Sequence, residues 1–261
     1  MMIYDDFAKP GWPRETFVEW RYPAADLWDP ATRVLCPGAP SNTLTLDLPE
    51  FTRSHYNHVK ALASTSQLFD LGGSNGFTVR AEISVETFGT AANPFGLPAG
   101  DPRLAAGALV LIDSTTGMVF DFFISNDRIT PLYERLPVAR DALGDYPAFS
   151  RLLTPVTTQQ GAWRRYETRY DRQADIVEWS VDRQVISRQD RAGAPIGTSG
   201  PAVKWNSLRV GIGLFTLLDD LCDDKERADD YPLIKGFIPD NTQDRFGQGA
   251  RISIRNLDIE I

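Results

Sequence analysis

The chain has 261 residues, of which 42% are hydrophobic and 24% are charged, and its formal net charge is −8 at pH 7. These proportions are typical of a folded globular protein. The acidic balance argues against a basic surface of the kind that binds nucleic acid, and it gives no attraction to anionic membranes. We therefore expect neither nucleic acid nor a membrane as a partner.

The first residues and the two cysteines bear on the cellular location. The N-terminal sequence MMIYDDFAKPGWP lacks the charged and then apolar pattern of a secretion signal. The sequence also contains no run of 18 apolar residues, the length that could span a bilayer as a helix. We expect a cytoplasmic protein in which Cys36 and Cys222 are free buried thiols rather than a disulfide. No glycine-rich phosphate loop precedes a helix, so we expect no nucleotide or other cofactor.

Strand patterns recur along the chain, separated by Gly, Pro, Asn and Asp. Residues 42–48 and 58–64 alternate between apolar and polar side chains, the second segment less cleanly. The clearest alternation is at residues 77–88, which predicts a strand with one buried and one polar face. The apolar face carries Phe77, Val79, Ala81, Ile83 and Val85, and the polar face carries Arg80, Glu82, Ser84 and Glu86.

The same pattern continues toward the C-terminus. Residues 108–113 are apolar on both faces, which predicts a central strand, and the segment 113–117 predicts a hairpin turn into a strand at 117–125. In the last strand the apolar positions change phase, which predicts a β-bulge near Arg255 and Asn256. The other predicted elements are strands at 128–135, 163–171, 176–181 and 208–215, and a short helix near 138–143.

About a dozen strands without intervening helices predict an all-β fold. Two antiparallel sheets that bury their apolar faces against each other satisfy this pattern best, so we expect a β-sandwich that forms one domain over residues 1–261. The segments 90–106, 137–162 and 216–249 are too long for turns. We expect them to be lid loops or surface loops.

Four stretches carry a resemblance to a known superfamily: GFTVRAEISVETFG, WRRYETRYDRQADIVEWSVDRQVISRQ, SLRVGIGLFTLL and GARISIRNLDIEI. In this order they resemble the strands of concanavalin-A-like jelly-roll sandwiches. The segments HVKAL and GLFTLLDD are similar to those of an uncharacterised bacterial and fungal family within this superfamily. The resemblance implies a fold shared by lectins, glucanases and noncatalytic modules, and it does not select one function.

Glu82 and Glu86 resemble part of the catalytic motif of laminarinase-like glucanases in this superfamily, Glu-x-Asp-x-Glu. The resemblance implies a nucleophile at Glu82 and an acid/base at Glu86, but Ser84 replaces the middle Asp. Four residues of strand separate the two Cα atoms by about 13 Å, whereas retaining glycosidases hold their carboxyl groups roughly 5–5.5 Å apart. The alternative interpretation is two glutamates paired with arginines on a sheet face.

Asp121 is the third candidate for acid/base catalysis. Its face of the predicted strand also carries Val119 and Phe123, and such apolar neighbours would raise the pKa of the carboxyl group. The alternative is a salt bridge to an arginine. If the polar faces of several strands meet on one concave sheet, they would bind a small molecule or a glycan. The predicted ligand-binding residues are His58, Lys60, Arg80, Ser84, Phe123, Tyr133, Glu134, Arg209, Gly211, Gly213 and Phe215.

Other polar clusters predict no metal site. His55 and His58 cannot share a strand face as a zinc pair. Six aspartates between residues 219 and 230 do not have the spacing of an EF-hand, which favours a solvated acidic lid over a calcium site. On the polar side of one predicted strand, Gly211 and Gly213 suggest close approach by a ligand or another backbone. Trp12, Trp20 and Trp28 are expected to cover an edge of the sandwich or to stack on a ligand.

The sequence leads to one main hypothesis and two alternatives. The main hypothesis is a cofactor-free enzyme, a cyclase or isomerase of biosynthesis, with Asp121, Glu82 or Glu86 as proton-transfer groups. The first alternative is a glycan-binding protein or a glycoside hydrolase of laminarinase-like type. The second is a noncatalytic interaction module. The sequence specifies neither the substrate nor the oligomeric state.

Overall fold

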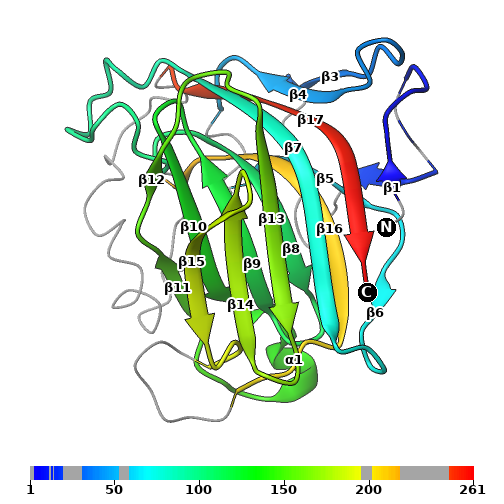
Figure 1. The fold of residues 1–261 in the computed structure, drawn as a ribbon. Helices are drawn as coiled ribbons and strands as arrows, with labels where there is room; N and C mark the ends of the chain where they lie inside the picture. Colours follow the sequence, from blue (N-terminus) through cyan, green and yellow to red (C-terminus); the bar gives the residue numbers. More distant parts are fainter. Residues whose placement is uncertain are drawn as a thin grey trace.

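The fold is a sandwich of two antiparallel sheets, as the sequence predicts. A computed structural model describes residues 3–11, 13, 15–19, 31–52, 59–194, 202–217 and 247–261. Figure 1 shows β7, β13, β14 and β17 in one layer, in front of the layer that holds β8, β9, β10 and β16. None of the helices in the described ranges is long and apolar enough to cross a membrane.

We call the eight-stranded layer sheet A. Its strand order is β15-β14-β13-β7-β17-β4-β3, and β1 pairs with β17. The strands of sheet A are β1 (Ile3–Asp5), β3 (Arg33–Leu35), β4 (Leu44–Leu48), β7 (Gly76–Phe88), β13 (Arg164–Asp171), β14 (Ile176–Val181), β15 (Gln184–Asp190) and β17 (Gly249–Glu260).

We call the nine-stranded layer sheet B. Its order is β11-β10-β9-β8-β16-β5-β2, with β12 paired to β10 and β6 paired to β16. The strands of sheet B are β2 (Phe17–Glu19), β5 (Val59–Thr65), β6 (Phe69–Asp70), β8 (Ala106–Asp113), β9 (Met118–Ile124), β10 (Arg128–Arg135), β11 (Phe149–Leu152), β12 (Val156–Thr157) and β16 (Ser207–Phe215).

The core between the sheets is centred on the ring of Phe120 in β9. This ring stacks on Trp205 with 4.4 Å between centroids, and it also contacts Trp179 at 5.7 Å, Tyr133 at 5.8 Å and Tyr170 at 6.0 Å. Trp179 and Tyr170 come from sheet A, whereas Tyr133 comes from sheet B. Because large rings bury the most apolar area, this cluster is a main contact between the layers.

Several local predictions are confirmed. The strands β10 and β14 have the predicted bounds, and η1 (Pro137–Ala139) with α1 (Arg140–Leu143) occupies the place of the predicted short helix. The predicted bulge is a register shift in β17 between Arg255 and Asp258, where Asn256 has a φ of 54°. The turn after β8 is closed by the Gly117 amide, which donates to the Asp113 carbonyl at 2.8 Å.

The N-terminal segment connects the two sheets. In sheet A, β1 pairs with β17, and in sheet B, β2 pairs with β5. Residues 3–19 therefore cross from one layer to the other, a connection that the strand patterns do not predict. The sequence also missed β3, β6, β11, β12 and β15, most of which are too short to show an alternation.

Candidate functional site

The predicted site residues lie on two opposite faces of the sandwich. The apolar residues of β7 and the ring of Phe120 in β9 belong to the same core between the sheets. Arg80 and Glu82 therefore point outward from sheet A, whereas Asp121 points outward from sheet B. The prediction of one hollow that both sets line is wrong, because β7 pairs with β13 and β17 while β9 pairs with β8 and β10.

On the outer face of sheet A, arginines alternate with carboxylates. Arg80 lies between three of them, with Nε 2.7 Å from Glu167, and Nη1 2.9 Å from Glu260 and 3.3 Å from Asp258. Ser84, also on this face, donates from its hydroxyl to the Gly161 carbonyl at 2.8 Å. These contacts are internal to the sheet and its flanking loop, so this part of the predicted ligand-binding set is already engaged.

Glu82 and Glu86 are each paired with an arginine from β17. The Glu82 carboxylate lies 2.7 Å from Nε of Arg255, and the Glu86 carboxylate lies 3.0 Å from Nη1 of Arg251. Arg255 also covers the ring of Trp163 at 4.4 Å. This is the arrangement expected from the alternative interpretation of the pair, in which each glutamate pairs with an arginine on a sheet face.

Because these ion pairs are partly exposed, they should contribute little to stability. We expect Glu82→Gln and Glu86→Gln each to lower the free energy of unfolding by less than about 1 kcal/mol, and the effect should shrink in high salt. Urea denaturation at low and high ionic strength measures both quantities. A loss well above 2 kcal/mol that salt does not change would show that these glutamates do more than pair with arginines.

A second apolar cluster covers the outer face of sheet B. Its members are all buried although they face away from the core between the sheets. Among them, the rings of Phe123 and Phe215 lie 5.2 Å apart, one from β9 and one from β16. The cluster contains Val59, Leu62, Ala106, Ala108, Val110, Ile112, Val119, Phe123, Leu132, Phe215 and Leu217.

Asp121 lies within this apolar face and is only 3% exposed. Its Oδ1 accepts the Leu111 amide at 2.9 Å. The ladder between β8 and β9 is interrupted there, between the pairs Leu109–Phe122 and Ile112–Val119. Burial raises the pKa of Asp121 well above its usual value, and the nearby charge of Glu134 raises it further. Within the described ranges no arginine or lysine pairs with Asp121, so the salt-bridge alternative is not observed there.

Because its pKa is raised, Asp121 should make the stability of the folded protein depend on pH. The folded state holds the Asp121 proton more tightly than the unfolded state does. The contribution of this proton to the free energy of unfolding is therefore complete below the unfolded pKa of about 3.9, and it is lost as the pH rises through the folded pKa. Asp121→Asn keeps an acceptor for the Leu111 amide without the charge. We expect the variant to gain stability relative to the native protein as the pH rises from 4 to 8. Thermal unfolding across this range measures the difference, and parallel curves would contradict the assignment.

Glu134 is the second carboxyl group on this face. It lies in β10 and is 5% exposed, and it accepts a hydrogen bond from the Ser150 hydroxyl. Leu132 is opposite Asp121 and Glu134 is opposite Val119, so the two acids are diagonal neighbours on adjacent strands. Diagonal positions have Cα atoms about 7–8 Å apart, which allows carboxyl separations of the size that glycosidases use.

Tyr133 faces the opposite way from its neighbour Glu134. Its hydroxyl accepts the Gly193 amide at 2.9 Å and donates to the Ala194 carbonyl, and its ring stacks on Phe120. Burial raises the pKa of Tyr133 to about 12. The prediction that Tyr133 binds a ligand on the polar face is therefore wrong, because this side chain lies in the core and anchors the segment at 193–194.

The other predicted ligand-binding residues of sheet B have internal neighbours. A Cβ on Gly211 would lie 2.9 Å from the Leu62 side chain, and one on Gly213 would lie 2.5 Å from the Phe215 ring. The space above both glycines is thus occupied by side chains of the chain itself. Two basic residues complete the set: buried Lys60 donates to the Thr52 carbonyl at 2.9 Å, and burial lowers the pKa of half-buried Arg209.

Some predictions lie outside the described residues. These are the ones about His55, His58, Cys222, the three tryptophans at 12, 20 and 28, the aspartates at 219–230 and most of the proposed lid at 216–249. Cys36 is a free buried thiol, as predicted, and burial raises its pKa. The described ranges contain no group of three His, Cys, Asp or Glu side chains that could hold a metal ion.

Solved structures of similar shape identify the fold. A family 16 endo-glucanase from Bacteroides ovatus matches with a TM-score of 0.52 at 10% identity, over 98% of both chains. Porphyranase B of Zobellia galactanivorans gives 0.50 at 9% identity, over 98% of this chain and 91% of that one. A LamA variant of Z. galactanivorans, solved with laminaritriose and laminaritetraose, gives 0.50 at 11% identity, over 97% of both. The fold is the concanavalin-A-like jelly-roll sandwich, as the sequence predicted.

Residues 21–261 match the sequence profile of the Family of unknown function (DUF6081), and the chain belongs to that family. An uncharacterised protein of Acanthamoeba polyphaga mimivirus is 58% identical over 40 residues, which are 15% of this chain and 9% of that protein. The match thus spans a small part of this relative. The N-terminal crossing at residues 3–19 precedes the matched region of the family.

Proposed function

We propose that this protein acts on a glycan, and that the outer face of sheet B holds its catalytic acids. The observation that carries the proposal is the diagonal pair of Asp121 and Glu134, two carboxyl groups on adjacent strands within apolar surroundings. Glycoside cleavage needs one acid that is protonated at working pH and a second carboxylate nearby. The raised pKa of Asp121 suits the first role, and Glu134 suits the second.

The sandwich fold supports this proposal by analogy. The solved proteins of similar fold include an endo-glucanase, a porphyranase and a protein complexed with laminari-oligosaccharides. Fold alone does not determine activity, so the argument depends on the acid pair. The rings of Phe123 and Phe215 beside it could stack on a sugar face. Since both acids are almost fully buried, a glycan reaches them only if the residues above this face move aside.

The test measures hydrolysis and binding separately. Laminarin and porphyran are the probes, with reducing ends as the readout of cleavage and titration calorimetry as the readout of binding. We expect Asp121→Asn to lower kcat at least about 100-fold, because it removes the general acid, and to leave affinity within a few fold. Glu134→Gln should have a similar effect. Glu82→Gln, on the opposite face, is the matched control and should keep full activity.

Two results would reject this assignment. One is a native protein that neither binds nor cleaves either polysaccharide. The other is loss of cleavage in Glu82→Gln with full activity in Asp121→Asn, which would place the catalytic site on sheet A.

A cofactor-free cyclase or isomerase is the second candidate, and the composition of the sheet B face favours it. Aliphatic side chains surround the acid pair, and such a lining suits an apolar small molecule better than a sugar. In this case an apolar dye such as anilinonaphthalene sulfonate should bind the native protein and be displaced by substrate. Polysaccharides should then fail to compete, which separates the two candidates.

A further inference from the structure

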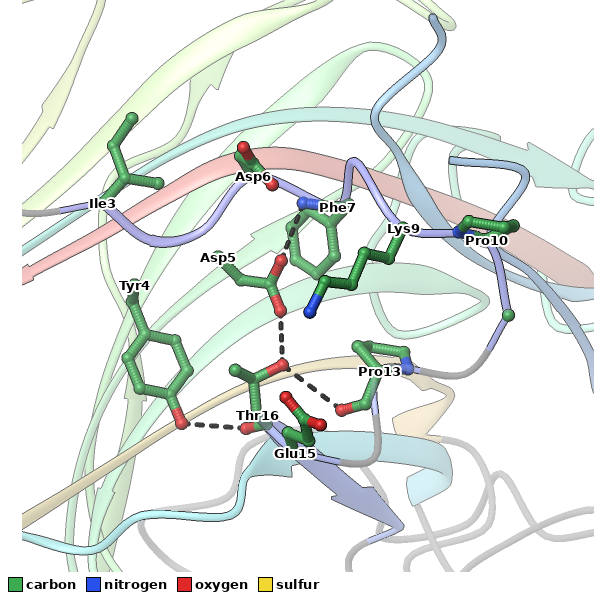
Figure 2. A pocket seen from close by; sticks show the side chains of 11 residues that line it. Ile3, Tyr4, Asp5, Asp6, Phe7, Lys9, Pro10, Pro13, Glu15 and Thr16 are labelled. Atoms are coloured by element: carbon green, nitrogen blue, oxygen red, sulfur yellow. Dashed lines mark hydrogen bonds between the residues drawn. The ribbon is translucent and has the colours of Figure 1, made fainter. Parts of the chain in front are cut away.

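The N-terminal crossing between the sheets encloses a hollow of about 500 Å³, shown in Figure 2. Its volume lies within the range of small-molecule sites in proteins. It lies apart from the acid pair of sheet B and precedes the region matched to the family. The side chains that matter for its chemistry are Tyr4, Asp5, Lys9, Pro13, Glu15 and Thr16.

Hydrogen bonds hold the walls of this hollow in place. Asp5 accepts from the Phe7 amide at 2.7 Å and from the Thr16 hydroxyl. The Tyr4 hydroxyl donates to the Thr16 carbonyl at 2.9 Å. Figure 2 shows these bonds as a connection from the strand of Tyr4 and Asp5 to the chain around Thr16. A site that is held in shape before a ligand arrives loses less entropy on binding.

Two charged side chains at the hollow lack partners among the described residues. Lys9 and Glu15 are exposed, and in the described part of the chain neither side chain makes an ion pair or a hydrogen bond. Their backbone carbonyls accept from the Cys36 thiol and the Ser66 hydroxyl, respectively. Figure 2 shows the Lys9 ammonium pointing into the hollow between Asp5 and Pro13, and the Glu15 carboxylate beside Thr16. Among the residues that the structure describes, the hollow thus presents a cation and an anion that have no charged partner.

We propose that this hollow binds a small zwitterion of the α-amino acid class. The ligand carboxylate would pair with Lys9, and its ammonium group would pair with Glu15, with Asp5 close by. An apolar ligand side chain would lie against Tyr4 and Pro13. Charge-assisted pairs of this kind are the stronger hydrogen bonds, and opposite charges at fixed positions select one orientation of the ligand.

Three probes that share the isobutyl side chain of leucine test the proposal. Leucine carries both charges, isopentylamine lacks the carboxylate, and 4-methylpentanoate lacks the ammonium group. Calorimetry with the full chain should give leucine at least a tenfold lower Kd than either analogue. Equal affinity for the three probes, or no binding of leucine at 10 mM, would overturn the proposal.

Two variants assign each charge to its side chain. Lys9→Met should bring leucine and isopentylamine to equal affinity, whereas Glu15→Gln should bring leucine and 4-methylpentanoate to equal affinity. Arg188→Met, on the edge strand β15, is the control and should leave both affinity ratios unchanged. If laminaritriose binds the native protein and Lys9→Met abolishes that binding, the hollow is a glycan subsite and the amino-acid assignment is wrong.

Discussion

Replacement of Asp113 by alanine is expected to lower the free energy of unfolding by about 3–5 kcal/mol. The carboxylate is fully buried and accepts four hydrogen bonds. Two come from the amide and hydroxyl of Thr115, at 2.9 and 2.6 Å, and two come from the Asn206 amide and the Ser207 hydroxyl, at 2.8 and 2.7 Å. Alanine leaves these donors without their acceptor, and the turn after β8 loses its connection to β16.

Urea denaturation of the native protein and of three variants measures the Asp113 effect. Asp113→Asn keeps one acceptor oxygen and should fall between the native protein and Asp113→Ala. Asp145→Ala is the control, because Asp145 is 84% exposed and makes only a 3.5 Å ion pair with Arg140. The control should change stability by less than about 1 kcal/mol. An equal effect at Asp113 and Asp145 would contradict the role of the buried carboxylate.

The second large effect is expected at Phe120. Phe120→Ala should cost about 3–5 kcal/mol, because it opens a cavity where aromatic rings from both sheets meet. For a protein of this size, that loss corresponds to a fall in Tm of roughly 10 °C. Calorimetric unfolding measures it, with Leu143→Ala on the exposed side of α1 as the control. A fall of less than about 2 °C would mean that the cluster does not couple the two sheets.

Local features of this fold are well predicted from the sequence. The alternation at residues 77–85 identifies the buried face of β7 because side chains of a strand point to opposite sides in turn. The phase change before Leu257 predicts the bulge for the same reason, since one extra residue moves every later side chain to the other face.

The location of each polar face could not be predicted from the same patterns. The β7 face that carries Glu82 and the β9 face that carries Asp121 lie on opposite outer surfaces of the sandwich. Which sheet a strand belongs to is decided by pairing between distant segments, and a local pattern carries no information about that pairing. Tyr133 shows the same limit, because its hydroxyl bonds to Ala194, which is 61 residues away.

The acid pair was partly within reach of the sequence. The sequence predicts Asp121 as a catalytic acid and Glu134 only as a ligand-binding residue, and the short turn at 125–128 sets the register that makes them diagonal neighbours. The N-terminal hollow carried no such signal, because it forms only when β1 and β2 pair with strands of different sheets. The cytoplasmic location stays a prediction.

The position of β17 has a consequence for biosynthesis. This strand lies between β7 and β4, and its Ser253 hydroxyl is 2.7 Å from that of Thr45, 208 residues earlier. A nascent chain therefore exposes β4 and β7 with one edge each unpaired until β17 has left the ribosome. Such non-local pairing slows folding and prolongs exposure to aggregation. We expect this protein to depend on chaperones that bind the incomplete sheet A while translation is completed.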